Sequence, residues 1–493
     1  MILAGSPVSA QFGQNKVQYQ DFTWKYVSTS HFDVYYNEGL LPVAEFCAAK
    51  AEEALAGLTR NLSYRVPKRV NIVVYGSHNE FQQTNVLSTF LPEGVGGVTE
   101  LFKNRVGVPF EGDWERFRHV IHHELVHAYL NEMLYSGSIK YALQTRVQLP
   151  LWMNEGLAEF ESLDGMDDAT DMFMRDITLN ETLPSLEELS NFFAYRGGQA
   201  FYAYVAETYG RGKIGELIAR VRAGGDVNSV FRSAFGMDVE QFSEKWQEDM
   251  KKLYYPDLEK FKRLDDFAKR LTNHVKEDTY YNSSPAISPD GSKMAFISYR
   301  DGEYGIYVVD IERKAEPTRL VSSQRTLNFE ELNVLTPGIS WNPKGDKIAI
   351  TAKAGGEDAL FIVDVRSGAY EKFVNDMRSM TSAAWSPDGA SIAIVATVKE
   401  KCDIHLFSVK ERRFRKLTDD PFTDAAPAWS LNSASVYFIS DRDTSVAARA
   451  VDNRELRSRD IRGRDIYRVD VQTGAVTRIT EDPGNVKTSL AVA

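Results

Sequence analysis

Four of the eight histidines in this 493-residue chain lie within nine positions, in the stretch HVIHHELVHAYL at residues 119–130. Within it, His123, Glu124 and His127 form the pattern H-E-x-x-H. Residues four apart lie on one face of an α-helix, so both imidazoles can reach one metal ion. Zinc suits this nitrogen-rich set, and Glu124 stands where a carboxylate can hold and deprotonate a water at the metal. The spacing therefore predicts a catalytic zinc site on a helix.

Helical register separates the remaining two histidines from this pair. His119 shares a face with His123 and His127, but eight residues of helix rise about 12 Å, whereas zinc–nitrogen bonds are about 2 Å long. One ion therefore cannot bind all three. A pair made of His119 and His123 would have Val120 in the position of the base, and His122 points away from the pair. We expect His119 and His122 to lie around the site or at the surface.

A catalytic zinc site needs a third protein ligand and an open position. Downstream, LPLWMNEGLAEFESL at 149–163 contains N-E-G at the start of a predicted helix. Together with H-E-x-x-H, this phrase resembles the gluzincin metallopeptidases, particularly the aminopeptidase N-like and related families. The resemblance implies that Glu155 is the third ligand and that Glu159, one helical turn later, supports a metal-bound histidine. The alternative is that both are solvated carboxylates on a helix.

A tyrosine follows in FFAYRGGQAFYAYV at 192–205, where Tyr195 begins a Y-x-x-G pattern. The same resemblance implies that Tyr195 donates a hydrogen bond to the oxyanion of the reaction. Tyr202 and Tyr204 lie close by, so ordinary packing is the alternative for this residue.

The G-x-M-E-N phrase that binds the free amino group in aminopeptidase N-like enzymes does not occur. GVGGVTELF at 94–102 lies where that edge strand belongs, and Glu100 is its only acid. An edge strand at this position can still pair with an extended peptide through backbone hydrogen bonds. Aminopeptidase specificity is therefore unsupported.

The elements that would position these residues occupy the first half of the chain. Apolar alternation and β-branched runs predict strands at 31–37 and 69–76 and a strand or hairpin at 96–110, and helical spacing predicts a helix at 41–62. Helical signals dominate from residue 185. They include a capping box at 185–188, a helix ending at Gly210 and another after Asp238. We expect an α/β to α-helical gluzincin-like metallopeptidase domain at 21–255 and a linker at 256–280.

The second half repeats one phrase. AISPDGSKMAFIS, ISWNPKGDKIAIT, AAWSPDGASIAIV and PAWSLNSASVYFIS, measured from Ser288, Asn342, Ser386 and Ser430, are 54, 44 and 44 residues apart. Short strands at such a period are typical of propeller blades. The phrases resemble the W-S-P-D-G signature of TolB-like β-propellers over roughly residues 280–480.

We therefore expect an all-β TolB-like propeller at 281–493 as the second domain of a multidomain chain. The last copy has lost its Pro-Asp-Gly, and a charged insertion at 441–465 interrupts it. Because a closed ring usually takes more than four blades, we expect an incomplete propeller and a protein that continues beyond Ala493.

Composition bounds the partners. The chain has 58 basic and 69 acidic residues and a net charge of −11, which argues against nucleic acid because phosphate binding needs a basic face. No run of about eighteen apolar residues occurs, so no transmembrane helix is predicted. The start MILAGSPVSAQFGQ resembles the end of a signal peptide before Gln11. Residues 1–20 are thus a signal-peptide remnant or a flexible N-terminus, and we expect an exported, periplasmic or cell-envelope protein, with the cytoplasm as the alternative.

Two functional hypotheses follow. The first is a zinc-dependent peptidase that cleaves a peptide or protein substrate, with the propeller as a docking or gating domain that can bind a protein partner. The second is a cell-envelope binding or scaffold protein whose propeller is the working part and whose zinc site is structural or vestigial. Glu124 favours the first, because a structural site has no need of a general base.

Overall fold

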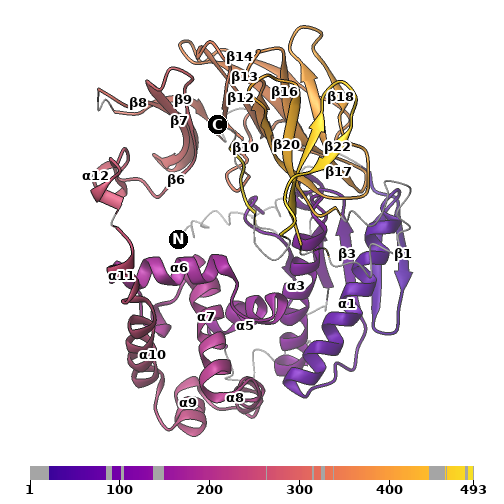
Figure 1. The fold of residues 1–493 in the computed structure, drawn as a ribbon. Helices are drawn as coiled ribbons and strands as arrows, with labels where there is room; N and C mark the ends of the chain where they lie inside the picture. The colour runs from indigo at the N-terminus through magenta and orange to yellow at the C-terminus, as the bar shows by residue number, and fades with distance from the viewer. Residues whose placement is uncertain are drawn as a thin grey trace, which may run out of the picture.

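The computed structural model describes residues 21–84, 91–101, 105–136, 149–262, 264–313, 316–323, 328–336, 338–442, 461, 463–482 and 487–491. The predicted signal-peptide remnant and most of the charged insertion lie outside these ranges. Figure 1 shows a helical half and, above it, an arc of β-sheets, with β6–β9 at one end of the arc.

A five-stranded sheet opens the chain, in the order β1-β2-β3-β5-β4. Strands β2, β3 and β5 are parallel to one another, while β1 and β4 pair antiparallel at the two edges. Its strands are β1 (Trp24–Ser28), β2 (Phe32–Asn37), β3 (Val70–Tyr75), β4 (Val98–Thr99) and β5 (Arg105–Pro109). The predicted strands at 31–37 and 69–76 and the hairpin within 96–110 are confirmed.

Helices α1 (Leu41–Leu62) and α3 (Trp114–Tyr135) pack on this sheet and share its core. The predicted helix at 41–62 is confirmed over its whole length. Helix α3 carries the histidines, and the side chain of Asp113 caps its N-terminus by accepting hydrogen bonds from the backbone N–H groups of Glu115 and Arg116. A capped start fixes where the helix begins and therefore which face each histidine occupies.

Most of the remaining helices form a second core rich in aromatic side chains, which includes Trp246 and Phe201, whereas α2 (His78–Gln82) packs through Phe81 beside Tyr75. The predicted capping box at Ser185 is confirmed, as are the helix end at Gly210 and the N-cap at Asp238. The helices are α2 (His78–Gln82), α5 (Leu151–Leu163), α6 (Asp168–Leu179), η1 (Leu186–Glu188), α7 (Phe192–Tyr209), α8 (Gly212–Arg222), α9 (Val227–Phe235) and α10 (Val239–Tyr254). Three short helices follow in the expected linker: α11 (Asp257–Lys260), η2 (Leu264–Asp266) and α12 (His274–Glu277).

Four antiparallel sheets make up the second half, one for each repeated phrase. The first contains β6 (Tyr281–Ile287), β7 (Lys293–Arg300), β8 (Glu303–Asp310) and β9 (Thr318–Ser322). The second contains β10 (Glu331–Leu332), β11 (Ser340–Trp341), β12 (Lys347–Lys353), β13 (Asp358–Asp364) and β14 (Tyr370–Phe373). The third contains β15 (Ser379–Trp385), β16 (Ser391–Val398), β17 (Lys401–Ser408) and β18 (Arg413–Lys416), and the fourth β19 (Asp424–Trp429), β20 (Ser435–Ser440), β21 (Asp465–Asp470) and β22 (Val476–Arg478).

The repeated phrase has two structural roles. Its glycine takes a left-handed backbone conformation at the turn, with φ of +76° at Gly389, and Ser433 holds the same position in the divergent fourth copy with φ of +57°. Its tryptophan joins neighbouring sheets: the indole N–H of Trp341 donates to Ala286 O at 2.9 Å, and that of Trp429 to Ala384 O at 2.9 Å. These two indoles tie the second sheet to the first and the fourth to the third, whereas the Trp385 indole donates to Gly389 O in its own turn.

Segments that follow β3 and β5 contact the second half of the chain, whose sheets lie above the N-terminal half in Figure 1. Because these strands are parallel, the loops that follow them emerge at one edge. After β3, Asn79 donates to Asp358 at 2.9 Å, and after β5, Asp113 forms an ion pair with Arg464. Ile461, which precedes β21, belongs to the core of the N-terminal sheet. The two halves therefore share buried contacts.

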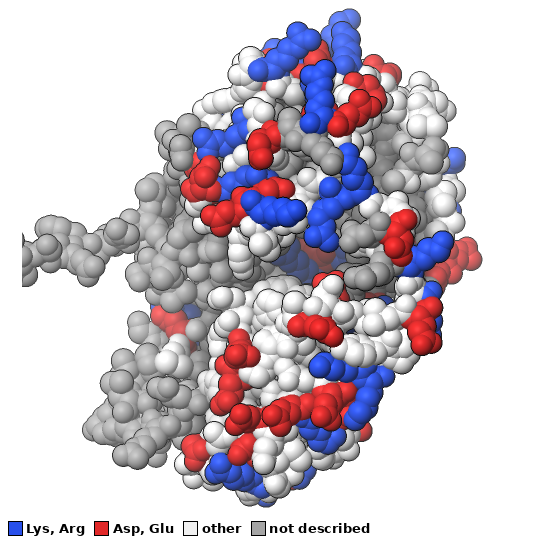
Figure 2. Space-filling model, turned by 90° about the vertical axis from the view of Figure 1, so that its left-hand side faces the viewer, with Lys and Arg blue, Asp and Glu red and all other residues white. Residues whose placement is uncertain are grey.

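Three further properties concern the molecule as a whole. No helix among the described residues is long and apolar enough to cross a membrane. Figure 2 shows basic side chains interspersed with acidic ones on the face that it presents. The two cysteines, Cys47 and Cys402, are separate buried thiols.

Candidate active site

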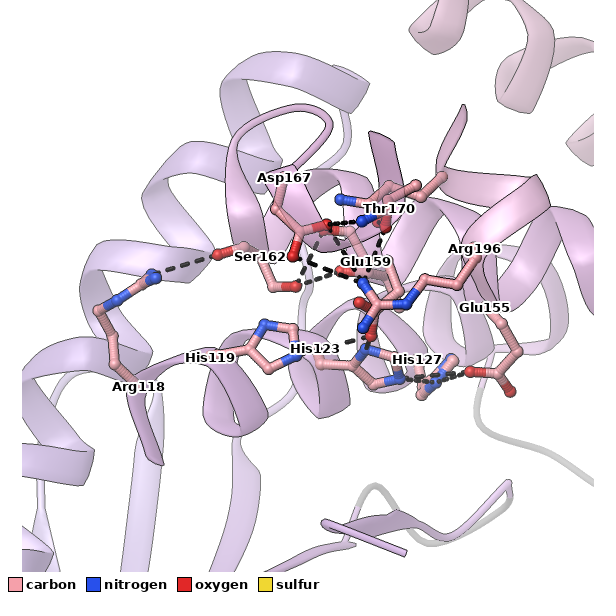
Figure 3. Close-up of polar contacts among 12 residues, drawn as sticks. Arg118, His119, His123, His127, Glu155, Glu159, Ser162, Asp167, Thr170 and Arg196 are labelled. Atoms are coloured by element: carbon pink, nitrogen blue, oxygen red, sulfur yellow. Dashed lines mark hydrogen bonds and ion pairs between the residues drawn. The ribbon is translucent and has the colours of Figure 1, made fainter. Parts of the chain in front are cut away.

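Two helices bring the predicted ligands together where α3 and α5 pack (Figure 3). The Nε2 atoms of His123 and His127 lie 3.1 Å apart. Each lies 3.2 Å from Oε2 of Glu155 on α5. Three ligand atoms from two helices thus form a nearly equilateral triangle, and His123 and Glu155 are buried.

The size of this triangle suits a small tetrahedral ion. Zinc bonds to nitrogen and carboxylate oxygen of about 2.0–2.1 Å place tetrahedral ligand atoms about 3.3–3.4 Å apart. The observed separations of 3.1–3.2 Å are close to that spacing. Two imidazoles and one carboxylate also leave a fourth position open, as in catalytic zinc sites. The residues present therefore fit a zinc ion.

Other side chains orient these ligands. Oε1 of Glu159 lies 3.0 Å from Nδ1 of His123, the nitrogen that faces away from the triangle. Asn154 does the same for the second histidine, because its Oδ1 lies 3.3 Å from Nδ1 of His127. Such partners fix the tautomer and the ring orientation of a metal-binding histidine. The role of Asn154 was not predicted, although it immediately precedes Glu155 in the N-E-G phrase.

The site is strongly polarised in the metal-free protein. Burial opposes protonation of His123, but hydrogen bonds to Glu155 and Glu159 outweigh it and raise the pKa of His123 to about 10. Burial likewise opposes ionisation of Glu155, yet hydrogen bonds to His123 and His127 lower the pKa of Glu155 to about 2. The pocket thus holds carboxylates in their anionic form and favours a cation between them.

Glu124 lies beside the triangle and lines a cavity of about 490 Å³ together with His123 and Tyr195. Its Oε2 accepts a hydrogen bond from the Thr99 hydroxyl at 2.6 Å. A side chain at Gly97 would come within 2.7 Å of Glu124 Cγ, so the carboxylate packs directly against this backbone. Thr99 on β4 is a second contact that was not predicted.

Tyr195 lies in the first turn of α7, where its ring stacks parallel to His123 with centroids 6.0 Å apart. Burial and the neighbouring Glu155 carboxylate raise the pKa of Tyr195 well above its usual value. The phenol therefore stays protonated and able to donate. The nearby tyrosines are engaged elsewhere: the Tyr202 hydroxyl donates to Met153 O, and the Tyr204 hydroxyl donates to Asp249.

The glycines of the two short motifs meet each other. A side chain on Gly156 of N-E-G would lie 2.3 Å from the carbonyl carbon of Gly198, the glycine that ends Y-x-x-G. A side chain on Gly198 would lie 2.2 Å from Trp152 O. Helices α5 and α7 therefore cross with their backbones in contact. This close crossing sets the separation between Glu155 and Tyr195.

The other two histidines lie outside the triangle. Nε2 of His119 lies 3.6 Å from Oε1 of Glu159, so it belongs to the surroundings of the site. His119, His123 and Glu159 form a second group of potential ligand atoms, but it shares His123 with the first. His122 lines a different cavity, and burial with nearby cationic Arg118 lowers its pKa to about 3.

Two family models match the chain. Residues 50–252 match the Peptidase MA superfamily, and residues 322–453 match the TolB beta propeller domain. The chain thus joins a domain similar to the Peptidase MA superfamily to a TolB-like propeller region. Both expected resemblances are thereby confirmed at the level of the superfamily. A comparison with curated proteins finds no match.

Several solved structures resemble part of this chain at low identity. TolB from Acinetobacter baumannii is 19% identical with a TM-score of 0.33, over 42% of this chain and 45% of that one. The putative TolB from Agrobacterium tumefaciens is 19% identical with a TM-score of 0.32, over 40% and 64%. The tricorn protease is 16% identical with a TM-score of 0.29, over 40% and 18%. The chain thus spans about half of the TolB chains it resembles.

Proposed function

We propose that this protein is a zinc-dependent peptidase that hydrolyses peptide bonds. The observation that carries the proposal is the triangle of His123, His127 and Glu155 with the Glu124 carboxylate in the adjoining cavity. A structural site would need a fourth protein ligand and no base. The match to the Peptidase MA superfamily supports the same conclusion.

In this proposal, His123, His127 and Glu155 hold the ion, which when bound would polarise the scissile carbonyl and acidify water. Glu124 accepts a proton from the attacking water as the water oxygen bonds to the carbonyl carbon. Glu124 then returns that proton to the amide nitrogen as the carbon–nitrogen bond breaks. Tyr195 donates a hydrogen bond to the oxygen that gains charge.

We expect the substrate to bind as an extended peptide along β4. This strand lies at the edge of the sheet, and the preceding Gly94–Gly97 segment lines the cavity that contains Glu124. Backbone hydrogen bonds to an edge strand give affinity without demanding a particular side chain. This mode needs no free amino terminus on the substrate, in keeping with a sequence that lacks the G-x-M-E-N phrase. We also propose that the protein is exported, because the residues before Gln11 resemble the end of a signal peptide.

The test compares the wild type with Glu124→Gln, which keeps the size of the side chain and removes its basicity. We expect both proteins to bind one zinc and only the wild type to cleave casein or a peptide library, because removing a general base costs about 100- to 10,000-fold. A wild type that binds zinc and cleaves nothing across a broad library would overturn the proposal. Equal cleavage by both proteins would exclude Glu124 as the base.

A further inference from the structure

The loop that forms one wall of the active-site cavity is held by the propeller. Residues Gly94–Gly97 line the cavity, and Glu93 immediately precedes them. The Glu93 carboxylate accepts hydrogen bonds from the backbone N–H groups of Val334 at 2.6 Å and Leu335 at 3.2 Å, which follow β10 of the second propeller sheet. The Thr336 hydroxyl lies 3.5 Å from its other oxygen.

A second glutamate completes the attachment from the propeller side. Glu331, on β10, accepts a hydrogen bond from the backbone N–H of Glu93 at 2.7 Å. Its other oxygen accepts one from the Gln82 amide at 2.7 Å, and that amide also donates to Leu91 O at 2.7 Å. The side-chain amide oxygen of Gln82 in turn accepts a hydrogen bond from the Lys353 ammonium group of the propeller. Glu331 thus holds the backbone of Glu93 directly and, through Gln82, the carbonyl oxygen of Leu91.

The attached loop reaches the candidate base within four residues. Val95 N–H donates to Pro92 O at 2.8 Å, which closes a turn. Gly96 then packs against Val120, and Gly97 packs against Glu124. Thr99 ends the path with its hydrogen bond to the Glu124 carboxylate. A displacement at Glu93 would therefore be felt at Glu124 and at the edge of β4.

Because the Gly94–Gly97 loop is rich in glycine, its order depends strongly on the contacts at its two ends. Gly94, Gly96 and Gly97 have no side chains with which to anchor themselves, and glycine loses more conformational freedom on ordering than any other residue. On the C-terminal side, β4 is held by its short pairing with β5. On the N-terminal side, Glu93 contacts Glu331, Val334, Leu335 and Thr336 of the propeller. The N-terminal half holds Leu91 separately, because its carbonyl oxygen accepts a hydrogen bond from Gln82 and its side chain packs with Phe81. The propeller contacts therefore fix the chain between Leu91 and the glycines.

We propose that the propeller segment Glu331–Thr336 is a positioning element of the active site, which holds the Gly94–Thr99 wall against Glu124 through Glu93. The catalytic part of this inference rests on the proposed peptidase function, whereas the structural coupling does not. Glu93 and Glu331 are positioning residues, because they act through the loop and do not touch the reacting atoms. The propeller then contributes to the wall that binds substrate, in addition to any docking role.

The experiment measures backbone hydrogen exchange across residues 91–99 in the full-length protein. The variants are Glu331→Ala, on the propeller, and Glu93→Ala, on the loop. Glu371→Ala is the matched control. Glu371 lies on β14, the outer strand of the same propeller sheet, and forms an exposed ion pair with Arg412. We expect amides of Gly94–Thr99 to exchange at least about tenfold faster in both interface variants, with α3 and α5 unchanged. The control should match the wild type.

Activity and metal content complete the test. In the interface variants we expect KM for a long peptide to rise about tenfold with one zinc still bound, since the edge that pairs with substrate is loosened. If Glu331→Ala fails to fold, Glu331→Gln keeps the shape of the side chain and loses its charge. Unchanged exchange at Gly94–Thr99, or an active enzyme whose KM does not respond, would overturn the proposal. A wild type without peptidase activity whose loop still responds would refute only the proposed function.

Discussion

His123 makes contacts through both of its ring nitrogens. Its Nε2 faces Glu155 and His127, while its Nδ1 lies 3.0 Å from Glu159. A carboxylate on the far nitrogen fixes the ring and makes the near nitrogen a better electron donor toward a metal. The strength with which His123 would bind a metal ion therefore depends on a carboxylate that does not itself touch the ion.

Glu159→Gln should weaken zinc binding without abolishing it. The neutral amide can still orient His123 but no longer strengthens it as a ligand, so we expect the zinc Kd to rise about 10- to 100-fold. Glu161→Gln is the control, because Glu161 lies on the same helix and accepts a hydrogen bond from Asn61 instead. Competition with a chromophoric chelator gives both constants. Equal Kd values for the two variants would contradict the role of Glu159.

Tyr195→Phe should lower kcat and leave the metal in place. Loss of one donor to a developing oxyanion costs about 100- to 1,000-fold in kcat. Tyr202→Phe serves as the control, since the Tyr202 hydroxyl donates to Met153 O within the core. We expect its kcat to lie within about twofold of the wild type at a stability cost of about 1 kcal/mol. Steady-state kinetics on one peptide distinguishes the two. A Tyr195→Phe enzyme with full kcat would exclude the donor role.

The sequence predicted the parts of the site that depend on helical periodicity. His123 and His127 could be paired, and His119 set aside, because the spacing of residues on one helix is fixed. Asn154 and Thr99 were not assigned, because each acts only after α5 or β4 has been brought to α3. Their positions depend on tertiary packing, for which one sequence carries no local signal.

At the scale of elements, the crossing of α5 and α7 controls the geometry. Gly156 and Gly198 meet backbone to backbone, so α5 can present Glu155 and α7 can present Tyr195 within one small site. The sequence showed both glycines inside their motifs but not that they face each other. Their pairing explains why a glycine follows the ligand in one motif and ends the other.

Gly156→Ala should separate these helices. The added methyl group would meet Gly198 backbone atoms at 2.3–2.6 Å, which no rotamer change can relieve. We expect a loss of about 3 kcal/mol in the free energy of unfolding and weaker zinc binding, because Glu155 moves with the helix. Gly212→Ala, where a methyl group meets nothing within 4 Å, should change neither quantity appreciably. Chemical denaturation and zinc titration measure both, and an unperturbed Gly156→Ala protein would contradict the crossing.

At the scale of the whole molecule, the two halves meet through buried polar contacts as well as apolar ones. The repeated phrases predicted the blades and their order, because each copy carries its own turn and tryptophan. The contacts between Glu93 and the second sheet could not be predicted, since they join residues about 240 positions apart and follow no repeat. The sequence therefore predicted the two kinds of domain but not the contacts between them.

Glu93 should make the stability of this interface depend on pH. Burial dominates and raises the pKa of Glu93 to about 7, with backbone N–H groups and Arg116 opposing it and Glu331 adding to it. Because the folded pKa exceeds the ordinary value near 4.5, the folded state holds this proton more tightly. The resulting stabilisation is present at low pH and is lost as pH rises toward and through 7.

The measurement compares the wild type with Glu93→Gln, which does not titrate at this position. Between pH 5 and pH 8 we expect the wild type to lose on the order of 2 kcal/mol relative to the variant, seen as a fall of a few degrees in its relative Tm. Calorimetry at four or five pH values would follow the trend. A Tm difference that does not change with pH would show that Glu93 does not titrate in this range.

The most direct test of the central claim is reconstitution of the metal-free protein. Chelated and dialysed wild type would be titrated with zinc while cleavage of a peptide library is followed. We predict no cleavage without metal, full cleavage at one zinc per chain, and no recovery for His127→Ala at that stoichiometry. Full cleavage by the metal-free protein, or a zinc-loaded wild type that stays inactive, would contradict the account.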